Sequence, residues 1–199
     1  MKNVLTHALF AVVLSLWLTM SAWAGLDEGE AAIERQDWAT AFEEFQPLAK
    51  RGIAAAQSWL GWLYEIGHYV EQDYIQAVIL YRMAAEQGYA PAQYRLGIMY
   101  GIGRGVPQDY AEKMKLYRMA AEQGYANALA TMGFLYEMGR HVPQDYIQAH
   151  MWYNLAAALD TKKQTLGLLG RLRVAKIMTP TDISKAQRLA REWFEEHGE

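Results

Sequence analysis

The side chains that most often carry out catalysis or hold a metal are few in this chain, and their spacing suits neither role. Beyond residue 24 the histidines are His68, His141, His150 and His197, and no two have the short spacing that places two metal ligands on one helix or loop. The chain has no cysteine, which excludes a thiolate metal site and a disulfide framework. We therefore expect neither a metal nor a cofactor.

Enzyme motifs are missing as well. The sequence contains no Gly-x-Ser-x-Gly nucleophile motif and no pair of carboxylates spaced for acid–base catalysis. The segment Gly-Ile-Gly-Arg-Gly at 101–105 has the composition of a phosphate-binding loop, but its Gly103 has counterparts at Gly67 and Gly139, each 36 residues away. These glycines mark turns, and the sequence predicts a protein that is not an enzyme.

The strongest pattern is an internal repeat of 36 residues. The segment 80–90 returns letter for letter as 116–126. The same offset aligns a Gln-Asp-Tyr triplet that begins at Gln72, Gln108 and Gln144. A fixed period of this length, in units too small to bury their own apolar face, is typical of a stacked solenoid.

The repeat also sets the expected organisation of the chain. We expect a secretory signal peptide at 1–24, a degenerate N-terminal capping repeat at 25–52 and C-terminal capping helices at 161–199. Between the two caps lie three full repeats, at about 53–88, 89–124 and 125–160.

Each repeat reads as two antiparallel helices joined by a loop. Apolar residues at helical spacing, such as Ala56, Leu60 and Leu63, predict a first helix that ends at a glycine. An aspartate then caps the second helix, with Glu112 and Gln148 placed to complete a capping box in two of the units. The second helix is expected to bury one stripe of residues. The stripe contains the first tyrosine of the helix, a second tyrosine seven residues later and the alanines that follow: Tyr74 and Tyr81, Tyr110 and Tyr117, and Tyr146 and Tyr153.

Two further details bear on packing. Gly61, Gly97 and Gly133 stand in the middle of the first helices, which indicates that a neighbouring helix crosses there at close range. After residue 159 the period is lost; Leu168, Leu172 and Ala175 predict one helix, and Thr179 is expected to cap the last one.

These motifs resemble the Sel1-like repeat, a relative of the tetratricopeptide repeat. The resemblance covers about residues 27–159, and the second unit carries most of its consensus positions: Ala92, Leu96, Gly97, Tyr100, Gly103, Gly105, Val106, Gln108, Asp109, Tyr110, Tyr117, Ala120, Ala121 and Gly124. The departures are His68 and Tyr69 in a turn, Lys113 in place of an alanine, and Asp160 in place of a glycine. The implied fold is all-α, a right-handed α-solenoid of antiparallel helix pairs.

The resemblance also implies a binding surface. In the tetratricopeptide fold the inner groove is lined by the first helix of each unit. The corresponding positions here are Ser58, Trp62, Glu65, Tyr94, Ile98, Gly101, Ala130, Phe134 and Glu137. If they are exposed, these positions form an apolar, aromatic strip for a protein or peptide partner. The alternative is that the same side chains pack against the adjacent repeat.

The first residues and the charge indicate the compartment and exclude some partners. Residues 1–3 carry one positive charge, residues 8–20 are apolar apart from Ser15 and Thr19, and Ala22-Trp23-Ala24 fits a cleavage site. We therefore expect a periplasmic or secreted protein without stable membrane insertion after cleavage, since the apolar run is short for a span; a retained anchor is the alternative. The net charge of −3 argues against nucleic acid as a partner.

Two functions are compatible with these features. One is a non-enzymatic scaffold or adaptor of the bacterial envelope that binds a protein or peptide in the concave groove. The other is a cell-wall or β-lactam-binding enzyme that resembles the cysteine-rich secreted Sel1 proteins. The absence of cysteine separates this chain from those relatives and favours the scaffold.

The period can be tested by deletion. Removing residues 92–127, one unit in phase, is expected to leave a soluble helical protein, because neighbouring interfaces in a repeat array are near copies. Removing 18 residues out of phase is expected to prevent folding. Circular dichroism compares the two proteins, and equal loss of helix in both would contradict the assigned period.

Overall fold

The structure, a computed structural model, describes residues 24–160 and 166–197. Helices, turns and loops make up this part of the chain, and no strand occurs in it. The predicted signal peptide lies outside the described residues except for Ala24. The chain divides into two compact units, one up to Ala84 and the other from Ala85, and each is described by itself.

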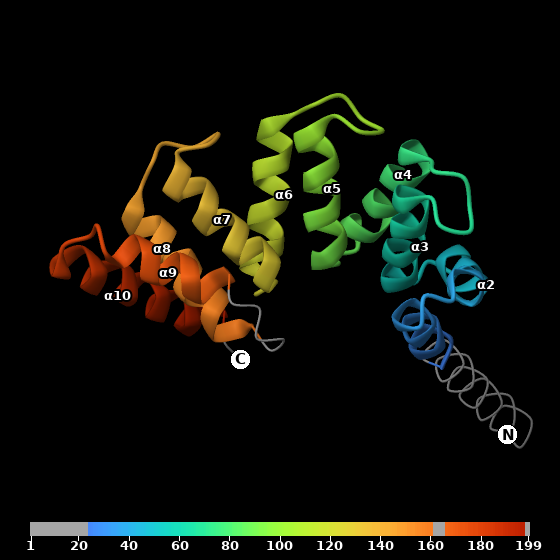
Figure 1. Ribbon diagram of the computed structural model, residues 1–199, viewed down its shortest axis with the longest axis horizontal. Coiled ribbons are helices and arrows are strands. Elements are labelled where there is room, and N and C mark those ends of the chain that lie inside the picture. Colours follow the sequence, from blue (N-terminus) through green and yellow to red (C-terminus); the bar gives the residue numbers. More distant parts are fainter. Residues whose placement is uncertain (1–23, 161–165, 198–199) are drawn as a thin grey trace, which may run out of the picture. The chain divides into compact units, whose positions relative to one another are not determined.

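Helices follow one another in the order that the repeat predicts. The first unit contains a helical stretch at 24–34, α2 (Trp38–Lys50), α3 (Ala54–Ile66) and most of α4 (Tyr74–Glu86). The second contains α5 (Ala90–Ile102), α6 (Tyr110–Glu122), α7 (Ala126–Met138), α8 (Tyr146–Leu159), α9 (Leu166–Ala175) and α10 (Pro180–His197). Figure 1 shows α5 and α6 side by side and joined by a long loop, and α7 and α8 form the next such pair.

The ends of the paired helices are capped as expected. Gly67, Gly103 and Gly139 all adopt positive φ, the left-handed conformation that ends a first helix without a Cβ clash. The Asp109 carboxylate accepts hydrogen bonds from the backbone N–H groups of Ala111 and Glu112 at 2.8 and 3.0 Å, and Asp73 and Asp145 do the same in their units. The second half of the capping box is not formed, because the Asp109 and Asp145 backbone N–H groups donate to the carbonyls of Tyr100 and Tyr136 at 2.9 and 3.0 Å instead.

The loops between paired helices are held by a hydrogen bond that recurs in every full unit. A glutamine Nε2 donates to the backbone carbonyl of the residue seven positions earlier: Gln72 to Glu65 at 2.9 Å, Gln108 to Gly101 at 2.8 Å and Gln144 to Glu137 at 2.8 Å. This bond ties the start of the second helix to the last turn of the first.

The mid-helix glycines mark close helix crossings, as predicted. A Cβ added to Gly133 would lie 2.7 Å from the Tyr153 ring, and one added to Gly97 would lie 2.7 Å from the Tyr117 ring. Gly61 meets the Tyr81 ring in the same way at 3.1 Å. In each unit the second-helix tyrosine therefore packs directly on the bare backbone of the first helix.

Most predicted core positions are buried, but the first tyrosine of the second helix is not. Tyr81, Tyr117 and Tyr153 are at most 5% exposed, whereas Tyr110 is 42% exposed. Tyr110 is the first residue of α6, and its ring stacks on that of His141 in the next loop, with centroids 3.8 Å apart. The prediction that Tyr110 belongs to the buried stripe is wrong.

The helix that Leu168, Leu172 and Ala175 predict is present as α9, but its leucines do not form the buried face. Leu168 and Leu172 are exposed, while Gly167, Gly170 and Val174 are buried. Glycine lets α9 approach α8 so closely that a Cβ at Gly170 would lie 2.4 Å from the Tyr153 ring. The larger leucines are therefore left on the outer side of the helix.

The last helix starts as expected. Thr179 Oγ1 accepts from the Asp182 backbone N–H at 3.2 Å and donates to the Asp182 carboxylate at 2.7 Å. Ala186 and Ala190 are the buried residues of α10, which packs against α8.

The glycine–tyrosine contact yields a direct comparison of two helical glycines. Gly133→Ala is expected to destabilise the protein by about 1–3 kcal/mol, because the new methyl group must displace a buried ring. Gly101→Ala is expected to be neutral or stabilising by up to about 1 kcal/mol, since its Cβ meets only the flexible Lys113 side chain and alanine favours helix. Urea unfolding followed by circular dichroism measures both; an equal loss in the two variants would contradict the assigned crossing.

Candidate functional site

The predicted groove residues of the first full repeat mostly pack against other residues of the protein. Ser58 is buried, and Trp62 is half-buried with its ring 5.9 Å from that of Trp38 and 5.7 Å from that of Trp59. Glu65 accepts a hydrogen bond from the Tyr81 hydroxyl at 2.6 Å. In this unit the aromatic strip therefore packs against the degenerate first repeat.

The compact part of the chain from Ala85 onward contains a hollow at several of the predicted groove positions. A cavity of about 390 Å³ is lined by α5, α7, α8 and α9, and its residues are Tyr94, Asn127, Ala130, Thr131, Phe134, Tyr153, Leu166, Leu169 and Arg173. We call it the first-helix groove. It brings together Tyr94, Ala130 and Phe134 from the predicted set, whereas Ile98 is half-buried beside the core.

The groove has an apolar wall that faces solvent. Phe134 is 39% exposed, and Leu166 and Leu169 are 64% and 55% exposed. Tyr94 is half-buried: its ring stacks on that of Tyr117, with centroids 5.2 Å apart. Exposed phenylalanine and leucine side chains around a cavity are a common feature of protein-binding surfaces.

A charged network closes one side of the groove. Arg173 donates from Nε and Nη2 to the two carboxylate oxygens of Glu137, both at 2.6 Å, and the Tyr153 hydroxyl donates to the same carboxylate at 2.7 Å. Hydrogen bonding to Arg173 holds the pKa of Glu137 below its usual value despite partial burial. Burial, followed by the bond to Glu137, raises the pKa of Tyr153, so this phenol stays protonated.

The role of Arg173 was not predicted from the sequence. A signal for it exists, because Arg173 stands 36 residues after Glu137, at the same position of the repeat. The loss of the consensus after residue 159 concealed that relation.

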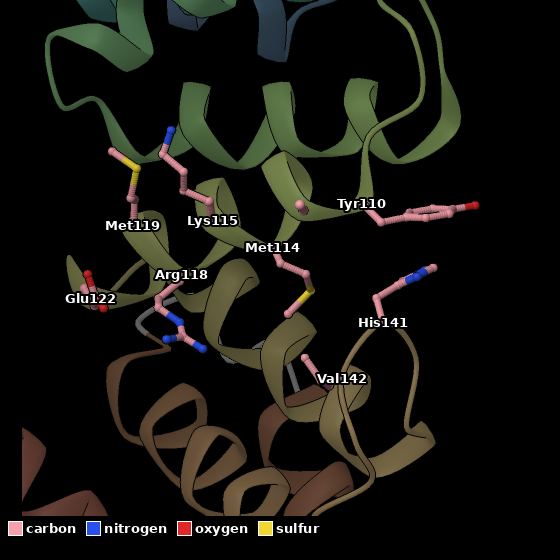
Figure 2. Close-up of a pocket in the computed structure, with 9 residues that line it drawn as sticks. Tyr110, Met114, Lys115, Arg118, Met119, Glu122, His141 and Val142 are labelled. Atoms are coloured by element: carbon pink, nitrogen blue, oxygen red, sulfur yellow. The ribbon is translucent and has the colours of Figure 1, made fainter.

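A second hollow lies along α6 and was also not predicted. This outer groove has a volume of about 560 Å³ and is lined by Tyr110, Ala111, Met114, Lys115, Arg118, Met119, Glu122, His141 and Val142. The rings of Tyr110 and His141 stack with centroids 3.8 Å apart. Figure 2 shows this pair at one end of the groove and Arg118 and Glu122 at the other. The groove was not predicted because Tyr110, which lines it, was expected to be buried in the core.

Histidine and acidic side chains do not gather into a metal site within the described part of the chain. His150 is 3% exposed, and burial followed by the charge of Arg171 lowers its pKa, so it stays neutral at pH 7. None of the helices at 24–160 and 166–197 combines the length and the hydropathy that a membrane span requires.

The fold and the grooves define a repeat protein built from helix pairs, the class of α-solenoids. The model of the Sel1 repeat family matches residues 54–89, 90–125, 126–160 and 177–196, which together make up more than half of the chain. The chain therefore belongs to the Sel1 repeat family. The fourth match falls on α10, within the segment predicted to form C-terminal capping helices.

Solved structures with the same fold support this assignment. A Sel1 repeat protein from Oxalobacter formigenes is 33% identical, with a TM-score of 0.65 over 79% of this chain and 44% of that protein. A protective antigen of uropathogenic Escherichia coli strains, which displays an SLR fold, is 24% identical, with a TM-score of 0.60 over 88% of this chain and 46% of the antigen. The chain spans less than half the length of either protein. No curated protein matches it.

The Glu137–Arg173 pair predicts a defined pH dependence. Because the folded-state pKa of Glu137 is depressed, its contribution to stability is present above its usual value of 4.5 and is lost as the pH falls through the folded value. Glu137→Gln is expected to cost about 1 kcal/mol near neutral pH, a figure reduced because Arg173 is more than half exposed.

The difference in unfolding free energy between the wild type and Glu137→Gln should shrink toward pH 3. Urea titrations at several pH values measure it, with Glu122→Gln, an exposed carboxylate on α6, as the matched control. A difference that stays constant with pH would contradict a charged pair.

Proposed function

We propose that this protein is a non-enzymatic scaffold that is exported to the periplasm or secreted, and that it binds a protein or peptide partner in the first-helix groove. One observation carries the proposal. Phe134, a predicted groove position, and Leu166 and Leu169 of α9 leave apolar surface exposed around a cavity of about 390 Å³.

Membership of the Sel1 repeat family supports this function at a coarse level, since such repeats generally mediate protein–protein interaction. Export rests on the predicted signal peptide alone. The partner is a segment with apolar side chains, because a cavity with exposed leucine and phenylalanine gains most from covering that surface.

The groove can be tested with the protein produced with its leader and purified from the periplasm. Selection from a displayed library of random twelve-residue peptides is expected to enrich sequences rich in Phe, Leu, Trp or Tyr. Phe134→Ala is expected to weaken binding of a selected synthetic peptide about tenfold or more, because an exposed aromatic anchor is lost. Fluorescence anisotropy measures the affinity.

The matched control is Met119→Ala, which removes an exposed apolar side chain from α6 that lines the outer groove instead. Its affinity should equal that of the wild type. A wild-type protein that selects no peptide, or a selected peptide that binds Phe134→Ala as tightly as the wild type, would refute the proposed groove. Recovery of the protein only from the cytoplasm would refute export.

A further inference from the structure

The residue at one position near the end of the first helix differs in charge from one repeat to the next. Glu65, Gly101, Glu137 and Arg173 follow one another at intervals of 36 residues. Where glutamate stands, the tyrosine of the same unit donates its hydroxyl to it: Tyr81 to Glu65 at 2.6 Å, and Tyr153 to Glu137 at 2.7 Å. The unit between them has glycine at this position and offers its tyrosine no carboxylate.

The tyrosine of that middle unit, Tyr117, is left without such a partner. Tyr117 is 5% exposed, and no hydrogen bond from its hydroxyl to another described residue is present. Burial, followed by the neighbouring Tyr94, raises its pKa, so the hydroxyl remains a donor at any physiological pH. A donor is therefore available where the other units hold a glutamate.

The same unit also has a lysine where the others have a buried alanine. Lys113 corresponds to Ala77 and Ala149, which are both fully buried. Its side chain lies over Gly101, so that a Cβ there would be 2.8 Å from Lys113 Cδ, and its Nζ is 5.5 Å from the centre of the Tyr117 ring. The loss of a glutamate and the gain of a lysine together reverse the charge of this site.

A second cation from the next unit joins Lys113. Arg140 has its guanidinium carbon 5.8 Å from the centre of the Phe134 ring, at the edge of the first-helix groove. Its neighbour His141 stacks on Tyr110, and the Tyr110 ring is 5.9 Å from Lys113 Nζ. Burial, followed by the charge of Arg140, lowers the pKa of Lys113, in keeping with two cations that lie near one another.

No carboxylate of the described residues pairs with Lys113 or Arg140. Helix α5 contains no acidic residue, and the one acid of α7, Glu137, is held by Arg173 and Tyr153. Lys113 thus lies over Gly101 with its ammonium group above the Tyr117 ring, and Arg140 lies over the exposed Phe134 ring. An external carboxylate would complete them with charge-assisted hydrogen bonds.

We propose that the partner peptide carries an aspartate or glutamate next to its apolar anchor, and that this carboxylate binds over Gly101 between Lys113, Arg140 and the Tyr117 hydroxyl. The inference rests on the proposed function, because it assumes a peptide in the first-helix groove. It adds the charge of that peptide: the partner supplies the acid that the middle repeat lacks.

The test extends the library selection with the full-length protein. Peptides selected by the wild type are expected to be enriched in Asp and Glu beside the aromatic or leucine residue. A synthetic selected peptide should bind at least about fivefold more tightly than its Asn or Gln counterpart, as expected for one partly exposed charge-assisted contact. Fluorescence anisotropy at two salt concentrations measures both peptides.

Three variants locate the preference. Lys113→Ala restores the alanine of the other repeats, and Gly101→Glu restores their carboxylate and so fills the site from within. Both are expected to abolish the preference for the acidic peptide while they retain binding of the neutral one. Lys115→Ala removes the same charge from an exposed position of α6 that pairs with Glu112, and it should keep the preference.

The outcomes separate this inference from the proposed function. Peptides selected without acidic enrichment, or an acidic preference that survives both Lys113→Ala and Gly101→Glu, would overturn the carboxylate site and leave the apolar groove standing. A wild type that selects no peptide would overturn both. Thermal unfolding checks that each variant folds, and should Lys113→Ala fail to fold, Gly101→Glu alone decides the question.

Discussion

The contact between a mid-helix glycine and a tyrosine ring is the constraint on which each repeat unit depends. The ring occupies the space that a side chain at the glycine would fill. The second helix can therefore pack directly against the backbone of the first. A glycine in a helix costs about 1 kcal/mol against alanine, and the burial of a whole tyrosine ring offsets that cost. The same contact sends the tyrosine hydroxyl toward the end of the first helix.

That direction links the core of a repeat to the proposed binding surface. A hydroxyl at the end of a buried ring needs a hydrogen-bond partner, and the side chain seven positions before the loop glutamine is within its reach. In the first and third units this side chain is a glutamate of the protein itself. In the middle repeat the Tyr117 hydroxyl has no glutamate to bind, and Lys113 adds a positive charge above the Tyr117 ring. The repeat tyrosine therefore takes part both in packing and in the proposed recognition.

The repeat made most of the fold predictable, because each rule could be checked against three copies of it. Glycine caps, aspartate caps and the close helix crossings are all found at the predicted residues. Prediction failed where a position lies at the end of its helix or outside the array. Tyr110 aligns with half-buried tyrosines yet is exposed, and in α9 two glycines rather than the leucines are buried.

The candidate site was predictable only in part for a related reason. Helical spacing identifies which side chains share a face, but exposure depends on the neighbour that covers that face. Phe134 lines an open cavity, whereas Trp62 at the equivalent position packs between Trp38 and Trp59. Trp38 of the degenerate first repeat and Trp59 of the same helix make that difference, and the 36-residue period carries no information about them.

The loop clamp of Gln72, Gln108 and Gln144 bears on how such a surface can change. Each glutamine binds a backbone carbonyl, and every amino acid offers that carbonyl. The loop therefore does not depend on the side chain of that residue. Glutamate and glycine occupy the clamped position in this chain without altering the clamp, and the next copy of that position, beyond the last clamp, holds arginine. The charge at this position can thus differ from one repeat of this chain to the next, because the loop holds the residue only by its main chain.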